Sequence, residues 1–256
     1  MSEPESTGVQ KARAQGSPGE PAADSGQTPP SPAAEGGFTE DSALALLRRA
    51  DLPTETIEQI AKNGAVARHR KVKVALLEHP HTPRHVSLPL IRQLYTFDLM
   101  QLALTPVVAA DLKMAADEAL CNRLETISSG ERLSLARRAS GRVAGALLLD
   151  AEARVMRAAL DNSRLTEPLI IKALMHPAAP AHYVEAVCHH GQWSLRREVR
   201  IALLRNEKTP MAKALEFARG LPPGLLREIL QNSRLPQSVK TYLVSTLHPG
   251  SKSRNA

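Results

Sequence analysis

A short pattern of apolar, helix-ending and turn-forming residues recurs along this chain and limits it to one kind of fold. In each copy an apolar residue is followed by apolar residues four and five positions later, by Asn or His at seven, and by Pro or Thr at eleven. Apolar residues at this spacing form one stripe on a helix. The copies therefore predict short amphipathic helices that end and restart at a fixed interval. The five copies begin at Val72, Val155, Leu169, Val199 and Leu225, and a weaker one begins at Leu99.

The seventh residue of each copy, which we call the helix-stop position, is expected to end the helix. Asn and His tolerate the left-handed backbone conformation better than most residues, and that conformation commonly ends helices. Proline at the eleventh position is expected to begin the next helix, where its missing N–H would be unpaired anyway. Thr82 and Thr209 are expected to cap that next helix. The helix-stop residues are His79, Asn162, His176, Asn206 and Asn232.

The repeats predict an all-α fold, an α-solenoid of stacked short helix pairs over residues 38–247. Short helix pairs cannot bury their apolar faces alone, so they must stack. The copies are 27 residues apart at one end and 26 at the other, with one step of 14 residues, where one helix closes one pair and opens the next. Composition agrees, because aromatic residues are only 3 % of the chain and Ala and Leu, which favour helices over strands, are abundant.

The two ends of the chain differ from this repeat region. Residues 1–37 contain six prolines and no Leu, Ile, Phe, Tyr or Trp, and so few apolar side chains cannot offset the entropy of ordering. We expect a disordered N-terminal tail over 1–37 and a flexible C-terminal tail over 248–256. The acidic start is not a secretory signal, no apolar run is long enough to span a bilayer, and two cysteines cannot form a disulfide framework. A cytoplasmic protein is therefore expected.

The repeats resemble a known family of helical repeats. Residues 72–83, VKVALLEHPHTP, and residues 199–210, VRIALLRNEKTP, resemble the leucine-rich repeat variant, which belongs to the HEAT/armadillo-like group of α-solenoids. The chain is also similar to bacterial HEAT-like repeat proteins, and the resemblance covers residues 65–247. It implies a scaffold whose concave surface binds another macromolecule. One leucine-rich repeat variant protein carries an iron–sulfur cluster on a cysteine-rich segment, which this chain lacks, so no cofactor is expected.

The residues with catalytic or metal-binding chemistry form no motif for either activity. Histidine alternates with Asn at the helix-stop position, which favours a backbone role over metal ligation. Cys188, His189 and His190 point in different directions on a helix, so a buried Cys beside a helix-ending His pair is expected. Asp117 and Glu118 are expected to be solvated. With no phosphate-binding glycine loop, His-Glu-x-x-His, Gly-x-Ser-x-Gly or Cys-x-x-Cys motif, neither an enzyme nor a metal site is expected. The histidines considered as ligands are His79, His81, His85, His176 and His182.

Basic clusters are the remaining sign of a function. Residues 38–256 contain 31 basic and 21 acidic residues, and clustered basic residues attract anionic surfaces such as nucleic acid. Long basic side chains also solvate the outer faces of a solenoid, and this alternative stays open. Trp193, one turn before Arg197, is expected to stack on a base or on a partner's side chain. The candidate anion- or partner-binding residues are Arg68, Arg70, Lys71, Lys73, Arg137, Arg138, Trp193, Arg196, Arg197 and Arg200.

Two functions follow as alternatives. The first is a non-catalytic scaffold or adaptor that binds a protein partner through its helical-repeat surface, because this function needs only the repeats. The second is a nucleic-acid-binding solenoid, similar in fold class and charge to the HEAT-like alkylpurine DNA glycosylases, which cradle duplex DNA in a basic concave surface. That family acts on a damaged base with aromatic and acidic residues. The only candidates for those roles here are Trp193, or Tyr95, Phe97 and Asp98, with no residue-by-residue match.

Overall fold

The protein is helical throughout the part that the structure describes. The computed structural model describes residues 38–247, which form sixteen α-helices, one 3₁₀ helix and no strand. The expected all-α fold is confirmed, whereas the expected tails, 1–37 and 248–256, lie outside the described residues. Between residues 38 and 247 no helix is both long and apolar enough to cross a membrane. The helices are α1 (Glu40–Leu47), α2 (Thr54–Lys62), α3 (Gly64–Ala67), α4 (Arg70–Glu78), α5 (Arg84–Arg92), α6 (Thr96–Leu104), α7 (Ala110–Arg123), α8 (Ser129–Arg138), α9 (Gly141–Leu147), α10 (Ala153–Leu160), α11 (Glu167–Met175), α12 (Ala181–His189), the 3₁₀ helix η1 (Trp193–Leu195), α13 (Arg197–Arg205), α14 (Met211–Arg219), α15 (Pro223–Gln231) and α16 (Gln237–Leu247).

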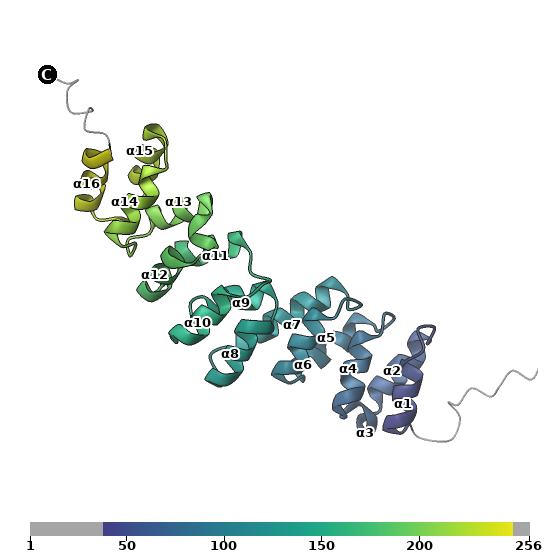
Figure 1. Cartoon of the computed structure of the whole chain (residues 1–256). Helices are drawn as coiled ribbons and strands as arrows, with labels where there is room; N and C mark the ends of the chain where they lie inside the picture. The colour runs from purple at the N-terminus through teal and green to yellow at the C-terminus, as the bar shows by residue number, and fades with distance from the viewer. Residues whose placement is uncertain (1–37, 248–256) are drawn as a thin grey trace, which may run out of the picture. The chain divides into compact units, whose positions relative to one another are not determined.

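The helices form two layers, and within each layer a helix packs on helices close to it in the chain (Figure 1). In the first layer α1 packs on α4 and α4 on α6, α8 packs on α10 and α10 on α12, and α14 packs on α16. In the second layer α5, α7, α9, α11, α13 and α15 contact one another in that order. Contacts between the layers join helices that are adjacent in the chain, such as α6 with α7 and α13 with α14. Repeated helix pairs that contact only their neighbours define a solenoid-like fold.

The repeat pattern occurs in both layers. Its copies in the first layer start at Val72 in α4, Leu99 in α6 and Val155 in α10, and those in the second layer start at Leu169 in α11, Val199 in α13 and Leu225 in α15. The step of 14 residues is the change from one layer to the other. There α11 packs on α9 and α13 of the second layer, and the expectation that one helix closes one pair and opens the next stays a prediction.

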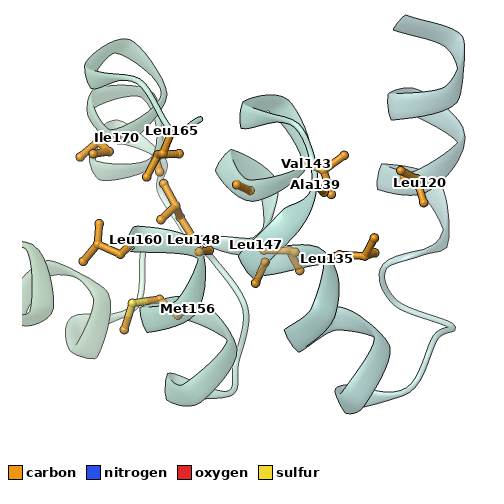
Figure 2. Close-up of a cluster of buried hydrophobic side chains, with 14 of the residues drawn as sticks. Leu120, Leu135, Ala139, Val143, Leu147, Leu148, Met156, Leu160, Leu165 and Ile170 are labelled. Atoms are coloured by element: carbon orange, nitrogen blue, oxygen red, sulfur yellow. The ribbon is translucent and has the colours of Figure 1, made fainter. Parts of the chain in front are cut away.

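A continuous apolar core lies between the two layers. Figure 2 shows its middle part, where side chains from α7, α8, α9, α10 and α11 meet. Leu135, Leu147 and Leu160, from α8, α9 and α10, are buried, and each leucine fully buried in this way contributes roughly 1.5–3 kcal/mol. Burial of the predicted apolar stripe is complete in α13, where Val199, Leu203 and Leu204 all lie in the core.

The helix-stop residues do end helices, but not through a left-handed backbone. The φ angles are −74° at His79, −68° at His176, −90° at Asn206 and −93° at Asn232. At these four residues the expected left-handed conformation is therefore wrong. Instead, the side chain accepts a backbone hydrogen bond: Oδ1 of Asn206 accepts from the N–H of Lys208 (2.9 Å), and Nδ1 of His79 accepts from the N–H of His81 (3.2 Å). Asn and His are interchangeable here because both place an acceptor at the same point in the turn.

The second polar atom of the asparagines reaches back to the preceding repeat. Nδ2 of Asn206 donates to the carbonyl oxygen of Leu174 (2.7 Å). Nδ2 of Asn162 donates to the carbonyl oxygens of Ala136 (2.8 Å) and Ala139 (3.3 Å) at the end of α8. Both asparagines are buried, so these cross-repeat hydrogen bonds are shielded from competing water.

His79 makes the equivalent contact with a ring nitrogen. Its Nε2 lies 2.9 Å from the carbonyl oxygen of Arg49 and therefore donates, which leaves Nδ1 as the acceptor in the turn. His176 and Asn232 differ, because they are exposed and form no cross-repeat hydrogen bond within residues 38–247. Three of the five helix-stop residues thus connect consecutive repeats.

The threonine and the proline of the pattern also each lie one position earlier, relative to the next helix, than the sequence predicts. Pro210 is the N-cap residue of α14 and not its first helical residue. The hydroxyl of Thr209 donates to the carbonyl oxygen of Leu203 (2.6 Å), so it satisfies the end of α13 and does not cap the start of α14. Thr82 and Pro83 repeat this arrangement between α4 and α5.

Candidate binding surface

The basic cluster near the start of α4 consists of Arg68, Arg70, Lys71 and Lys73, and one of these residues, Arg70, forms an ion pair within the fold. Nε of Arg70 lies 2.8 Å from Oδ2 of Asp98 in α6, and Asp98 is buried. This ion pair joins α4 to α6 and occupies the carboxylate considered for a catalytic role. Arg68 and Lys71 are exposed and Lys73 is half-buried, and none of the three forms an ion pair within the described part of the chain. These three residues remain accessible to a partner.

The aromatic candidates divide into one buried and two exposed residues. Trp193 is only 5 % exposed, and its Nε1 donates a hydrogen bond to the carbonyl oxygen of Leu160 (3.0 Å). Its ring is part of the core, contrary to the expectation that it stacks on a ligand. Tyr95 and Phe97, at the start of α6, are 71 % and 39 % exposed.

The cluster that follows Trp193 does not form a single charged helix face. Arg196 is the N-cap residue of α13, Arg197 is its first residue, and both are exposed. Nε of Arg200 donates to the carbonyl oxygen of Ser194 (2.6 Å), and its guanidinium lies 5.5 Å from the centre of the Phe217 ring. Arg200 is therefore held by the fold, and only Arg196 and Arg197 project freely.

The cluster at the end of α8 is extended by arginines that the sequence reasoning missed. Arg137 lines an open groove of about 380 Å³ together with Arg154 and Arg157 of α10. The signal in the sequence is the spacing of three residues between Arg154 and Arg157, which places both on one side of a helix. What the sequence lacks is the contact between α8 and α10, which brings Arg137 to them. We call this site the arginine groove; its lining residues are Arg137, Arg154, Arg157, Ala158 and Asp161.

A second open groove, of about 440 Å³, adjoins the arginine groove on the side of α12. The two share Arg157 and Asp161. The carboxylate Oδ1 of Asp161 lies 3.1 Å from Nε2 of His190, which is therefore the donor. The residues lining this second groove are Arg157, Leu160, Asp161, His182, Glu185, Ala186, His189 and His190.

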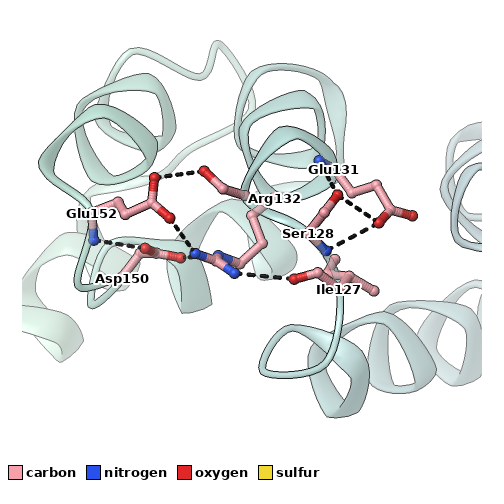
Figure 3. A network of polar contacts seen from close by, with 7 residues as sticks. Ile127, Ser128, Glu131, Arg132, Asp150 and Glu152 are labelled. Atoms are coloured by element: carbon pink, nitrogen blue, oxygen red, sulfur yellow. Dashed lines mark hydrogen bonds and ion pairs between the residues drawn. The ribbon is translucent and has the colours of Figure 1, made fainter.

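Arg132, in the same helix as Arg137, has a structural role. Its Nε lies 2.8 Å from Oδ2 of Asp150, one Nη lies 2.7 Å from Oε1 of Glu152, and the other donates to the carbonyl oxygen of Ile127 at 3.1 Å (Figure 3). The side chains of Arg132 and Asp150 are only 19 % and 8 % exposed. These four residues, the Arg132 network, fasten α8 to the loop that leads into α10.

Two of the groups considered for metal binding or catalysis, Cys188 and Asp117, lie in the interior of the fold. Cys188 is buried beside His189 and His190 at the end of α12, as expected, and burial raises the pKa of its thiol to about 12. Asp117 is buried and accepts a hydrogen bond from Oγ of Ser140 (2.7 Å), so the expectation that it is solvated is wrong. Burial raises the pKa of Asp117, an effect that the Ser140 hydrogen bond opposes. Among residues 38–247 no three His, Cys, Asp or Glu side chains gather as a metal site would require.

Comparison with family models, curated proteins and solved structures finds no match to this chain. The chemistry of its surface is therefore the guide to what it binds. Arginines that lack carboxylate partners can bind anions by charge and by paired N–H donors. The arginine groove brings three of them to one place.

Proposed function

We propose that this chain is a non-catalytic binding module that presents its stacked helices to another macromolecule. The observation that supports it is the set of buried cross-repeat hydrogen bonds made by His79, Asn162 and Asn206. Because each bond fixes one helix pair on the preceding one, the exposed faces on either side of these three contacts are held in a fixed arrangement. A fixed arrangement of exposed faces is what an extended binding surface needs.

The residues that line the two grooves support the same function. They come from three consecutive helices of one layer, α8, α10 and α12, and many are charged or polar and accessible. The resemblance of the repeats to the leucine-rich repeat variant, a class of scaffold, also supports the proposal. A scaffold of this class binds through side chains spread over several repeats and not through a single deep pocket.

The test is affinity capture with the full chain, followed by identification of the retained macromolecules, and a comparison of two charge-reversal variants. One variant reverses two charges on the first layer, with Arg154→Glu and Arg157→Glu. The other reverses two charges on the second layer, with Lys172→Glu and Arg227→Glu. All four side chains are exposed, so helicity by circular dichroism should be unchanged. We expect a macromolecule that the wild type retains and that the first variant loses but the second keeps. Retention of nothing beyond an unrelated control protein, or equal retention by both variants, would contradict the proposal.

A further inference from the structure

The arginine groove has an unbalanced charge. Arg137, Arg154 and Arg157 form no ion pair and donate no side-chain hydrogen bond within the described part of the chain. The one carboxylate in the groove, that of Asp161, already accepts from His190. Arginine stays protonated at any physiological pH, so the repulsion cannot be relieved by loss of a proton. Three arginines and one carboxylate therefore share one open groove, which keeps an excess of positive charge.

The acidic residues of α8 and of the loop that leads into α10 do not neutralise this charge, because each has another partner. Asp150 and Glu152 bind Arg132. Glu131 forms the capping box of α8, since its carboxylate accepts from the backbone N–H of Ser128 (3.1 Å). The acids of the α8–α10 pair are thus committed to structure, while the arginines of the groove are not.

The position of Arg154 is unfavourable for the helix that carries it. It lies in the first turn of α10, whose N-cap residue, Glu152, makes no side-chain cap and is paired with Arg132. The N-terminal end of a helix carries a partial positive charge, so a basic residue there is destabilising and an acidic one is preferred. Helix stability therefore gives no reason for an arginine at this position, and a bound anion would offset its charge.

From these observations we propose that the arginine groove binds the phosphate backbone of a nucleic acid, an inference that rests on the proposed binding function. Phosphodiesters offer two oxygens to the paired N–H donors of each guanidinium, and a polymer supplies several phosphates in a row for the three arginines. The adjoining groove, which shares Arg157, continues the site toward His182 and His189 of α12, although Glu185 also lines it. Because Trp193 is buried in the core, stacking from that residue contributes nothing, and binding has weak sequence preference.

The experiment measures binding of the full chain to fluorescein-labelled single-stranded and duplex DNA of mixed sequence by anisotropy, over a range of salt concentrations. The groove variant carries Arg137→Gln, Arg154→Gln and Arg157→Gln. The matched control carries Arg48→Gln, Arg219→Gln and Arg227→Gln, which remove the same net charge from exposed positions outside the groove. Parallel measurements use polyglutamate and inorganic phosphate as competitors.

We expect the wild type to bind DNA with an affinity that falls steeply with salt. The groove variant should lose about tenfold or more in affinity, and its log–log salt slope should fall by roughly 2–3 if each arginine neutralises one phosphate. The control should keep most of the affinity and slope. Equal losses in both variants, or equal competition by polyglutamate, would overturn the assignment to nucleic acid, as would release of DNA by inorganic phosphate at micromolar concentration.

Failure of this inference is distinguishable from failure of the proposed function. If the wild type binds no DNA at low salt but retains a protein in the capture experiment, the nucleic-acid assignment is wrong and the binding function stands. If neither nucleic acid nor protein is retained, both are wrong.

Discussion

Two arginine sites lie on the same helix pair, α8 and α10, and differ in their partners. Arg132 has two carboxylates and a carbonyl oxygen within hydrogen-bonding distance and is mostly buried. Arg137, five residues later in the same helix, shares an open groove with two more arginines and one carboxylate that is already engaged. Both positions of α8 carry an arginine. Arg132 forms ion pairs that stabilise the fold, whereas Arg137 has no ion-pair partner among residues 38–247.

The difference shows that a basic cluster has to be judged by its partners and not by its charge. Arg70 and Arg200 belong with Arg132, because the fold uses their hydrogen-bond donors. Arg137, Arg154 and Arg157 have no such use within residues 38–247. Substitutions at the two sites should therefore separate stability from binding, and the following predictions are ordered by the size of the expected effect.

The largest effect is expected at the Arg132 network. Arg132→Ala leaves the buried carboxylate of Asp150 without its ion-pair partner, and breaking a buried pair in this way costs about 3 kcal/mol. Arg137→Ala, the same change in the same helix, should alter the free energy of unfolding by less than about 0.5 kcal/mol. Urea denaturation followed by circular dichroism measures both. Similar losses in the two variants would remove the distinction between the sites.

A smaller loss is expected where the turn after α10 is fixed on α8. Asn162→Gly removes two hydrogen bonds to the end of α8 and the one accepted from the N–H of Arg164, at a cost of about 2 kcal/mol. Gly would replace Asn162 freely only if the residue ended the helix through its backbone conformation alone, whereas its side chain makes these three bonds. Asn232→Gly is the control, since within residues 38–247 the side chain of this exposed residue bonds only to its own helix, and it should cost about 0.5 kcal/mol. A wild-type unfolding midpoint for Asn162→Gly would show that the cross-repeat bonds do not stabilise the pair.

The close contact between α9 and the turn after α10 gives the third prediction. A Cβ atom added at Gly141 would overlap the carbonyl oxygen of Arg164, whereas one added at Gly130 in α8 would meet open space. Gly→Ala in a helix usually stabilises by about 0.5–1 kcal/mol. Gly130→Ala should show this gain, and Gly141→Ala should instead lose about 1–2 kcal/mol because the backbone must shift. The unfolding temperatures of the two variants test this prediction. A higher unfolding temperature for Gly141→Ala would mean that the turn after α10 moves to accommodate the added Cβ atom without loss of stability.

The architecture was largely predictable from the sequence, because the apolar spacing is a local property of each helix. The helix-stop residues show where local reasoning ends. The sequence places Asn162 and Asn206 at helix ends, but their side chains act on carbonyl oxygens 26 and 32 residues earlier in the chain. Only the stacking of repeats brings those oxygens near, so a local backbone preference was the natural and incorrect explanation.

The candidate site was less predictable for the same reason. Arg137 was recognisable as part of a basic run, whereas Arg154 and Arg157 stand apart in the sequence and become its neighbours only through the contact between α8 and α10. Trp193 shows the opposite error. An isolated tryptophan beside arginines is typical of a binding surface. The ring of Trp193 instead lies in the core, and its N–H donates a hydrogen bond to the carbonyl oxygen of Leu160.

The smallest effect on stability is expected from the arginine groove itself, and its sign is the informative quantity. Replacing Arg137, Arg154 and Arg157 by Gln removes mutual repulsion and an unfavourable charge at the start of α10. At low salt the variant should therefore be more stable than the wild type by about 0.5 kcal/mol, the size of an exposed charge interaction. Raising the salt to about 1 M shortens the screening length to roughly 3 Å, so the gain should disappear there. The control Arg48→Gln/Arg219→Gln/Arg227→Gln should show no such gain, because these arginines lie apart on α14, α15 and the end of α1. A loss of stability in the groove variant at low salt would mean that the three arginines stabilise the fold, as Arg132 does. Their positive charge would then already be balanced within the protein and would not be available to bind a phosphate.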